Sequence, residues 1–318
     1  MIEVERLTKH FGPVAAVDGL SMAVGRGEIV GLLGPNGAGK TTTMRMLTTY
    51  IPPDRGRATL AGHDVLDEPI EVRRRVGYLP ENVPLYLEMR TREYLNYRAR
   101  LRDVPRAKRR AAIDRVVASC RLVEVEHRIL GQLSKGFRQR VGLAEAMVHD
   151  PDILILDEPT AGLDPIQIRE VRALIRDLGA RHTILLSTHI MSEVEAVCSR
   201  VVIIARGRVA VDEPIDRLRT AGAVVAVEAR GPADAIRKAL ESIPGVGRIE
   251  VTSRDGERVA LEVESRPGAD LREAIADRVV RGGWTLSRLD LRRSSLEDRF
   301  VQAVVAADLQ ASQAAGAA

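Results

Sequence analysis

The sequence has few aromatic side chains and no long apolar run. Of its 318 residues, three are Phe, five are Tyr and one is Trp. The longest purely apolar stretches, such as Val201–Ala205, fall far short of the roughly 18–20 residues that cross a bilayer. The first residues, MIEVERLTKHFG, are acidic from the third position and lack the apolar centre of a secretory signal peptide. We therefore expect neither a transmembrane helix nor secretion.

Cysteine is almost absent as well. The two cysteines, Cys120 and Cys198, lie far apart in the sequence, each within an apolar helical pattern. Isolated thiols in such surroundings are typical of buried side chains in the reducing cytoplasm. We expect no disulfide and no metal site that uses them.

The excess of positive charge is small. The 48 basic residues and 44 acidic residues leave a net charge of +4. Basic and acidic residues alternate, as in Arg254-Asp255-Gly256-Glu257-Arg258, which is typical of solvated surfaces of mixed sign. Proteins that bind single-stranded nucleic acid also stack bases on aromatic side chains, and this chain has few. We therefore expect no nucleic-acid partner.

The pattern of the first 212 residues or so predicts an α/β fold. Short β-branched runs alternate with helical patterns such as Pro165–Leu178, for which Asp164 is the expected N-cap. Such alternation predicts a mainly parallel sheet that binds ligands at the carboxyl ends of its strands. The expected parallel strands are Glu28–Leu33, Ile153–Leu156, Thr183–Leu186 and Arg200–Ala205, and antiparallel strands are expected at Ile2–Leu7, Leu20–Val24 and Ala58–Ala61.

A smaller α+β domain is expected after a boundary near Ala221-Gly222. Its predicted element order, β-α-β-β-α-β, is the ferredoxin-like order. The expected strands are Ala223–Glu228, Arg248–Ser253, Arg258–Glu264 and Trp284–Asp290, and the expected helices are Pro232–Ser242 and Ala269–Arg281. A last helix is expected from the capping box Ser294-Ser295-Leu296-Glu297. The predicted domains are 1–220 and 221–308, followed by a disordered tail at 309–318.

A glycine-rich segment separates the apolar run Glu28–Leu33 from the helical run Thr42–Leu47. It reads Gly34-Pro35-Asn36-Gly37-Ala38-Gly39-Lys40-Thr41 and fits G-x-x-x-x-G-K-[ST] in the required strand–loop–helix context. Glycines let backbone N–H groups converge on phosphate oxygens, and the helix N-terminus adds the positive end of its dipole. We expect this loop and Thr42 to bind nucleotide phosphates, with Lys40 reaching the β- and γ-phosphates and Thr41 binding Mg²⁺.

Two acidic residues end the apolar strand Ile153–Leu156. Asp157 is placed to hold Mg²⁺ through water, and Glu158 to orient or deprotonate an attacking water. Terminal acids on an apolar strand are equally compatible with capping or a salt bridge when they stand alone. Their occurrence together with the phosphate-binding loop favours the catalytic interpretation.

The segment Leu133-Ser134-Lys135-Gly136-Phe137-Arg138-Gln139-Arg140 lies between these motifs and precedes a helical run. With it the chain, over about residues 1–220, resembles the ATP-binding subunit of an ABC transporter. The resemblance implies a P-loop ABC-type fold with a helical subdomain at about 82–150 and ATPase activity. It also implies a dimer in which Ser134 and Gly136 contact the nucleotide held by the other subunit. Phe137 replaces the commoner Gln, and Ser-x-Gly alone is more often a simple helix cap.

Further elements of the family occur in the same order. Phe11 resembles the aromatic residue that stacks on adenine, with an ordinary core Phe as the alternative. Ala161-Gly162-Leu163-Asp164 resembles the loop that couples the two ATP sites of the dimer. His189, at an expected strand end, resembles the switch histidine that contacts the γ-phosphate.

One position departs from the family. Glu81, in Gly77-Tyr78-Leu79-Pro80-Glu81-Asn82, stands where the family usually has Gln. A carboxylate can still bind Mg²⁺, and its charge near the γ-phosphate would slow or retune hydrolysis. This stretch resembles the subgroup of ABC-2-type exporters linked to gliding motility, sodium efflux and drug export. C-terminal extensions in that subgroup often end in a sequence like Leu296-Glu297-Asp298-Arg299-Phe300.

Four of the nine aromatic residues, Tyr78, Tyr86, Tyr94 and Tyr97, follow one another within a short segment. In the family this region forms the groove that receives a helix of the membrane subunit, and Tyr is enriched in protein interfaces. A local core cluster explains the same pattern equally well.

The resemblance as a whole implies an ATP- and Mg²⁺-dependent homodimeric ATPase on the cytoplasmic face of the cell membrane, which powers an ABC-2-type permease subunit. The rival class is a non-transport ABC ATPase that acts on DNA or the ribosome. Repair and chromosome proteins of that class carry long coiled-coil insertions, whereas the segment between Lys40 and Ser134 has no heptad pattern. Ribosome-acting members carry two cassettes in one chain, and this chain has one. The sequence does not identify a cargo.

Overall fold

The structure, a computed structural model, describes residues 1–220, 223–266, 270–293, 300–301 and 305. These residues divide into two compact units, Met1–Glu213 and the described part of Pro214–Gln302. The predicted boundary at 221–222, the capping box at 294–297 and the tail at 309–318 lie outside the described residues, and the domain limits stay a prediction. None of the helices in the described part of the chain is long and apolar enough to cross a bilayer.

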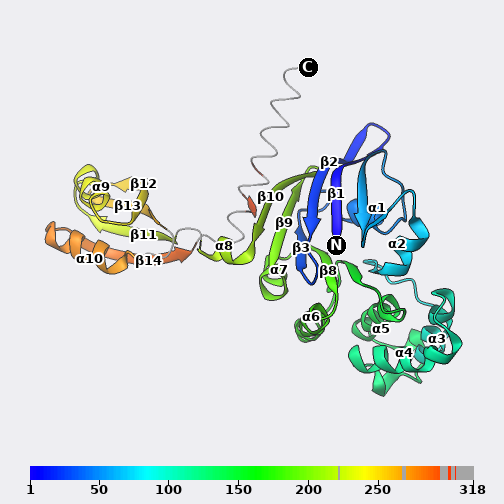
Figure 1. The fold of residues 1–318 in the computed structure, drawn as a ribbon. Helices are drawn as coiled ribbons and strands as arrows, with labels where there is room; N and C mark the ends of the chain where they lie inside the picture. Colours follow the sequence, from blue (N-terminus) through cyan, green and yellow to red (C-terminus); the bar gives the residue numbers. More distant parts are fainter. Residues whose placement is uncertain (221–222, 267–269, 294–299, 302–304, 306–318) are drawn as a thin grey trace. The chain divides into compact units, whose positions relative to one another are not determined.

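A six-stranded, mainly parallel sheet forms the centre of the first unit (Figure 1). Its inner strands are fully or almost fully buried, as expected for parallel strands that are covered on both faces, whereas the edge strand Arg208–Pro214 is exposed or half-buried along its whole length. In strand order they are β10 (Arg208–Pro214), β9 (Arg200–Ala205), β3 (Ile29–Leu33), β8 (Thr183–Thr188), β7 (Ile153–Asp157) and β6 (Val76–Leu79). The α/β fold predicted from the sequence is confirmed.

The register of this sheet brings the ends of four strands together. Leu33 at the end of β3 pairs with Thr188 at the end of β8, and Asp157 at the end of β7 pairs with Ser187. Leu79 at the end of β6 pairs with Leu156. The loops that follow β3, β6, β7 and β8 therefore leave the sheet at one edge, which is where a parallel sheet binds its ligands.

A second, antiparallel sheet packs against the first unit's core. It consists of β2 (Val14–Val24), β1 (Ile2–Phe11), β4 (Arg55–Leu60) and β5 (His63–Asp64), in that order. Leu7 and Leu20 of this sheet belong to one buried cluster with Leu32 of β3 and Met44 of α1 (Lys40–Leu47). The core thus supports the segment between β3 and α1 from two sides.

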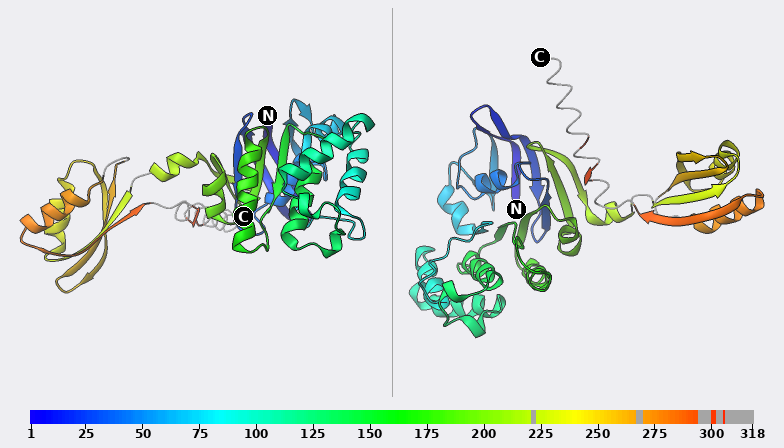
Figure 2. Two further views of the ribbon diagram at one scale, coloured as in Figure 1. Left: turned by 90° about the horizontal axis from the view of Figure 1, so that it is seen from below. Right: turned by 180° about the vertical axis from the view of Figure 1, so that it is seen from behind.

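Helices complete the first unit. The helices α3 (Thr91–Leu101), α4 (Arg106–Ser119) and α5 (Lys135–Met147) gather at one end, away from β1 and β2, in both Figure 1 and the view from behind in Figure 2. The remaining helices are α2 (Pro69–Arg75), α6 (Pro165–Gly179) and α7 (Met191–Val197). Asp164 caps α6 as expected, because its carboxylate accepts from the N–H groups of Ile166 and Gln167 at 2.9 Å. Both cysteines are buried and free, and burial raises the pKa of each thiol to about 12.

The second unit has the predicted β-α-β-β-α-β order, preceded by the short helix α8 (Ile215–Thr220). Its sheet is antiparallel with strand order β12-β13-β11-β14, and it has its own buried core, which includes Val227, Ile236 and Ile275. The elements are β11 (Ala223–Arg230), α9 (Ala233–Glu241), β12 (Val246–Asp255), β13 (Arg258–Ser265), α10 (Arg272–Arg281) and β14 (Thr285–Arg293). The ferredoxin-like expectation is confirmed.

Candidate active site

The glycine-rich loop connects β3 to α1 in a conformation that requires glycine. Gly39 is the N-cap of α1 and has φ +105°, and a Cβ atom on it would lie 2.4 Å from the carbonyl oxygen of Ala16. A Cβ atom on Gly34 would lie 2.5 Å from the carbonyl oxygen of Ile204. The loop is therefore enclosed by β2 and β9, and its backbone is held at the N-terminus of α1.

Lys40 is the first residue of α1, and its side chain is buried beneath the loop. Its ammonium donates to the carbonyl oxygens of Gly34 at 2.7 Å and Pro35 at 3.2 Å. It also lies 3.7 Å from a carboxylate oxygen of Glu158. The pKa of Lys40 is lowered because burial penalises the charged ammonium, and the negative charges of Glu158 and Asp157 oppose this shift. The loop thus encloses a cation within reach of two acids.

Asp157 and Thr41 meet across the edge of the sheet. The hydroxyl of Thr41 donates to Oδ1 of Asp157 at 3.2 Å, and the hydroxyl of Ser187 donates to the same oxygen at 2.6 Å. The other oxygen, Oδ2, is buried and has no hydrogen-bond partner among the described residues. An ionised carboxylate buried with one oxygen unsatisfied is unfavourable unless a cation or water binds it. The site therefore has the oxygen donors that Mg²⁺ prefers.

Glu158 follows β7 in the left-handed region, with φ +46°. Its backbone N–H donates to the hydroxyl of Ser187 at 3.0 Å, which fixes this conformation. Its carboxylate oxygens lie 3.0 Å and 3.1 Å from Nδ1 of His189. Although Glu158 is buried, the ring of His189 is half exposed. The Glu158–His189 pair therefore extends from the buried end of β7 to the solvent-exposed surface at the carboxyl edge of the sheet.

Lys40, Thr41, Glu158 and His189 line one cleft of about 440 Å³, whereas Gly34, Pro35 and Asp157, also predicted from the sequence, are not among its lining residues. Phe11 lies at its rim with 53% of its surface exposed, and the ammonium of Lys9 lies 5.9 Å from the ring centre. Phe11 is therefore not an ordinary core residue. The lining residues predicted from the sequence are Phe11, Asn36, Gly37, Ala38, Gly39, Lys40, Thr41, Thr42, Glu81, Glu158 and His189.

Ser134 and Gly136 do not line this cleft. Ser134 caps α5 by accepting from the N–H of Phe137 at 3.3 Å, and a Cβ atom on Gly136 would lie 2.7 Å from the side chain of Gln167. One chain alone does not bring the two residues to its own phosphate-binding loop.

The sequence did not single out Ser187 and Glu193. Ser187 joins Asp157 to the backbone of Glu158, as described above. Glu193 on α7 is buried and accepts from the hydroxyls of Thr160, in the loop after Glu158, and Thr188, beside His189. Arg172 on α6 lies 3.6 Å from Glu193. For Ser187 the available signal was a polar residue at a buried strand end, whereas Glu193 lies on a helix, and no local pattern revealed the partners of either residue.

A parallel sheet whose edge carries a glycine-rich loop, a buried lysine and two acids defines a P-loop nucleotide-binding protein. The ABC transporter family model matches residues 17–161. The chain is 35% identical over 308 residues to the daunorubicin resistance ATP-binding protein DrrA2 of Streptomyces coeruleorubidus, covering 95% of this chain and 94% of that protein. It is 38% identical over 280 residues to the Nod factor export ATP-binding protein I of Paraburkholderia xenovorans, covering 85% and 91%.

A solved structure of an ATP-binding subunit of an ABC transporter matches with a TM-score of 0.63 and 32% identity, over 69% of this chain and 92% of that one. A dimeric ATP-binding cassette with ADP and Pi in a post-hydrolysis state has the same fold, with a TM-score of 0.62 and 22% identity over 68% and 99% of the two chains. The chain belongs to the ABC transporter family and is an ATPase of that family.

Proposed function

We propose that this chain is the ATP-hydrolysing subunit of an ABC-2-type exporter and acts on the cytoplasmic face of the cell membrane. The observation that carries the proposal is the single cleft that brings Lys40, Thr41, Glu158 and His189 together below Phe11. The relatives support the direction of transport, because their names refer to daunorubicin resistance and Nod factor export.

Each residue of the cleft has its own role in ATP binding or hydrolysis. Phosphate oxygens of ATP take the place of the carbonyl oxygens that now accept from Lys40, and the loop's N–H groups complete the cradle. Glu158 accepts a proton from the attacking water, because its carboxylate is at the cleft and is oriented by Ser187 and His189. His189, on the exposed side of the pair, holds the γ-phosphate. Phe11 offers its exposed ring to the adenine.

Mg²⁺ fits the donors of this site. Thr41 and Asp157 would hold the ion, since the free Oδ2 of Asp157 is a hard anionic oxygen, and Glu81 lines the same cleft. Bound there, the ion would neutralise charge on the β- and γ-phosphates. The carboxylate of Glu81 adds a negative charge beside these phosphates and slows or retunes hydrolysis relative to the amide usual in the family.

Two such chains would complete the site as a homodimer. Ser134 and Gly136 lie at the start of α5 and outside their own chain's cleft, so each pair is available to the ATP of the other chain. The rings of Tyr86 and Tyr97 meet edge to face with centroids 5.6 Å apart, and Tyr86 is 46% exposed. Since Tyr94 is fully buried and Tyr78 packs against the core of the first unit, Tyr86 and Tyr97 are the members of this cluster that would contact the permease.

Isolation of the chain from membranes tests the proposal. The Glu158→Gln variant with bound ATP should remain in a closed dimer, and we expect mass spectrometry to identify a permease with about six transmembrane helices in the same complex. Wild-type protein without ATP provides the matched comparison. Recovery of ribosomes or DNA in place of a permease would support the rival class and reject the exporter proposal.

A further inference from the structure

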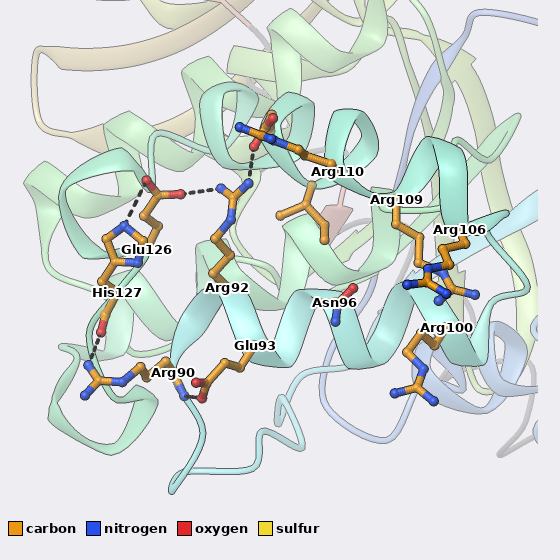
Figure 3. Close-up of a pocket in the computed structure, with 12 residues that line it drawn as sticks. Arg90, Arg92, Glu93, Asn96, Arg100, Arg106, Arg109, Arg110, Glu126 and His127 are labelled. Carbon is orange, nitrogen blue, oxygen red and sulfur yellow. Dashed lines mark hydrogen bonds and ion pairs between the residues drawn. The ribbon is translucent and has the colours of Figure 1, made fainter.

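A second pocket lies between α3 and α4, away from the ATP cleft (Figure 3). Its volume is about 1080 Å³, and its lining also includes Glu126 and His127, which follow α4 in the chain. None of its lining residues lines the ATP cleft. The proposed function therefore leaves this pocket unexplained.

One end of the pocket carries arginines that lack carboxylate partners. Arg100 lies in the last turn of α3, and Arg106 and Arg109 lie in the first turn of α4. Figure 3 shows the three guanidinium groups at the same end of the pocket. Within the part of the chain that the structure describes, none of the three forms an ion pair, and Nε of Arg109 donates only to the neutral carbonyl of Val104 at 2.7 Å. This end carries a net positive charge.

The opposite end is different, because the acidic side chains of Glu93 and Glu126 lie there beside the arginines. Arg92 forms ion pairs with Asp114 and with Glu126, the latter at 2.6 Å, and Arg90 donates to the carbonyl oxygen of His127. Figure 3 shows these contacts as dashed lines. The fold therefore neutralises Arg92 but leaves Arg100, Arg106 and Arg109 without a counter-charge.

The uncompensated charge is unfavourable where it lies. The first turn of α4 reads Arg106-Ala107-Lys108-Arg109 and has no acidic residue, although the helix dipole disfavours cations at that end. Three like charges at the same end of the pocket also repel one another, although water and salt weaken this repulsion because Arg100 and Arg106 are exposed. A bound anion would relieve both effects. Such a local violation of favourable electrostatics is typical of a functional site.

We propose that Arg100, Arg106 and Arg109 form a binding site for a phosphate-bearing anion with two or more negative charges. The planar donor fork of a guanidinium matches phosphate oxygens, and three uncompensated cations call for more than one charge. The rest of the ligand lies along Asn96 and Ile113, which line the pocket beyond the arginines. A soluble phosphorylated molecule and the headgroup of an anionic phospholipid share this chemistry.

Calorimetric titration with inorganic pyrophosphate tests the site. The titration uses full-length chains that carry Lys40→Ala, so that the phosphate-binding loop does not contribute. Addition of Arg100→Gln, Arg106→Gln and Arg109→Gln should weaken binding at least about a hundredfold, since each charge-assisted hydrogen bond accounts for about tenfold or more. The matched control replaces Arg26, Arg176 and Arg181, three exposed arginines outside the pocket, by Gln and should leave binding unchanged.

Vesicle sedimentation distinguishes the two sources. One set of vesicles contains phosphatidylcholine alone, and the other also contains phosphatidylglycerol. Binding to the second set only, and only when the three arginines are present, would assign the anion to a lipid headgroup. Pyrophosphate binding without vesicle binding would assign it to a soluble molecule. Equal pyrophosphate affinity in the pocket variant and the control would overturn the proposal. A chain that binds polyglutamate but not pyrophosphate would overturn it as well. A chain with the three pocket substitutions but with Lys40 intact is assayed separately for ATP hydrolysis. This assay shows whether the fold and the ATP cleft are intact, and it is independent of anion binding in the pocket.

Discussion

At the scale of single residues, the ATP cleft depends on unusual backbone conformations. Gly39 has φ +105° at the start of α1, and Glu158 has φ +46° at the end of β7. A left-handed non-glycine residue costs stability, and the surrounding hydrogen bonds must maintain it. Here the hydroxyl of Ser187 binds the backbone N–H of Glu158. The loop and the candidate base are therefore both preorganised by the backbone.

Two glycines of the loop provide a matched pair of substitutions. Gly37→Ala introduces a side chain at φ +78° with open space around it, so it should cost about 1 kcal/mol of strain. Gly39→Ala adds a 2.4 Å contact with the carbonyl oxygen of Ala16 and should cost about 3 kcal/mol or more and abolish ATP binding. Urea unfolding and ATP titration measure both. Equal stability losses in the two variants would contradict the close packing assigned to Gly39.

His149 predicts a pH dependence of stability. It is largely buried with Nε2 3.2 Å from the carbonyl oxygen of Val76, and burial together with the charge of Arg102 lowers its pKa from 6.5 to about 4. Because the unfolded chain binds the proton more readily, stability is present above pH 6.5 and is lost as the pH falls toward 4. Between about pH 7 and about pH 5 the loss from His149 is about 2 kcal/mol.

Urea unfolding at the two pH values measures this loss. The variant His149→Gln keeps an amide N–H that can reach Val76 but does not titrate in this range. It should therefore lose about 2 kcal/mol less than the wild type on acidification. The same pH dependence in both proteins would show that other groups cause it.

At the scale of elements, the loops after β7 and β8 share one anchor on α7. Glu193 accepts from Thr160 of the first loop and from Thr188 of the second, so that Glu158 and His189 are carried by loops tied to the same carboxylate. The contact between β7 and β8 through Asp157 and Ser187 adds a second tie. The geometry of the candidate catalytic pair therefore depends on Glu193 of α7 through these two threonines.

Glu193→Gln tests this anchor. The amide offers one acceptor oxygen in place of two, so one threonine hydroxyl must accept from the amide N–H instead of donating, and the charge-assisted hydrogen bonds become neutral ones, at a cost of about 1–2 kcal/mol. We expect a lower kcat at an unchanged KM for ATP, because the loops lose their common support while the phosphate-binding loop stays intact. Thr160→Val and Thr188→Val should each reproduce part of the effect. A variant that loses stability but keeps its kcat would limit Glu193 to a structural role.

The sequence predicted the elements better than it predicted their contacts. Apolar periodicity located β3, β7 and β8, and because parallel strands end at one edge, it also placed Lys40, Asp157 and His189 near one another. The hydrogen bonds of Ser187 and Glu193 join residues whose proximity arises only from tertiary packing, and no local pattern encodes them. The pocket between α3 and α4 was missed for the same reason. Only the structure shows that Arg92 is paired with Asp114 and Glu126 while other arginines of the pocket have no acidic partner in the ranges that the structure describes.

At the scale of the whole molecule, each unit has its own hydrophobic core. Residues in the first core come mainly from β1 to β4, β6 to β9, α1 and α2, whereas those in the second core come mainly from β11 to β14, α9 and α10. Cooperative unfolding follows the core that holds a set of elements together. Each unit is therefore expected to unfold as a cooperative unit of its own.

Scanning calorimetry should resolve two transitions in the full-length chain. Addition of ATP and Mg²⁺ to the Glu158→Gln variant at about 100 times the dissociation constant adds about 2.7 kcal/mol to the first unit. Its midpoint should rise by about 5–10 °C while the second midpoint stays in place. A single transition, or an equal shift of both, would contradict the assignment of ATP binding to the first unit alone.

The most direct test of the central claim compares ATP binding with ATP hydrolysis in Glu158→Gln. If Glu158 is the general base and the rest of the cleft binds the nucleotide, the variant should bind ATP as tightly as the wild type and hydrolyse it about 10²–10⁴ times more slowly. The variant Lys40→Ala should lose binding itself. Wild-type turnover by Glu158→Gln would contradict the account.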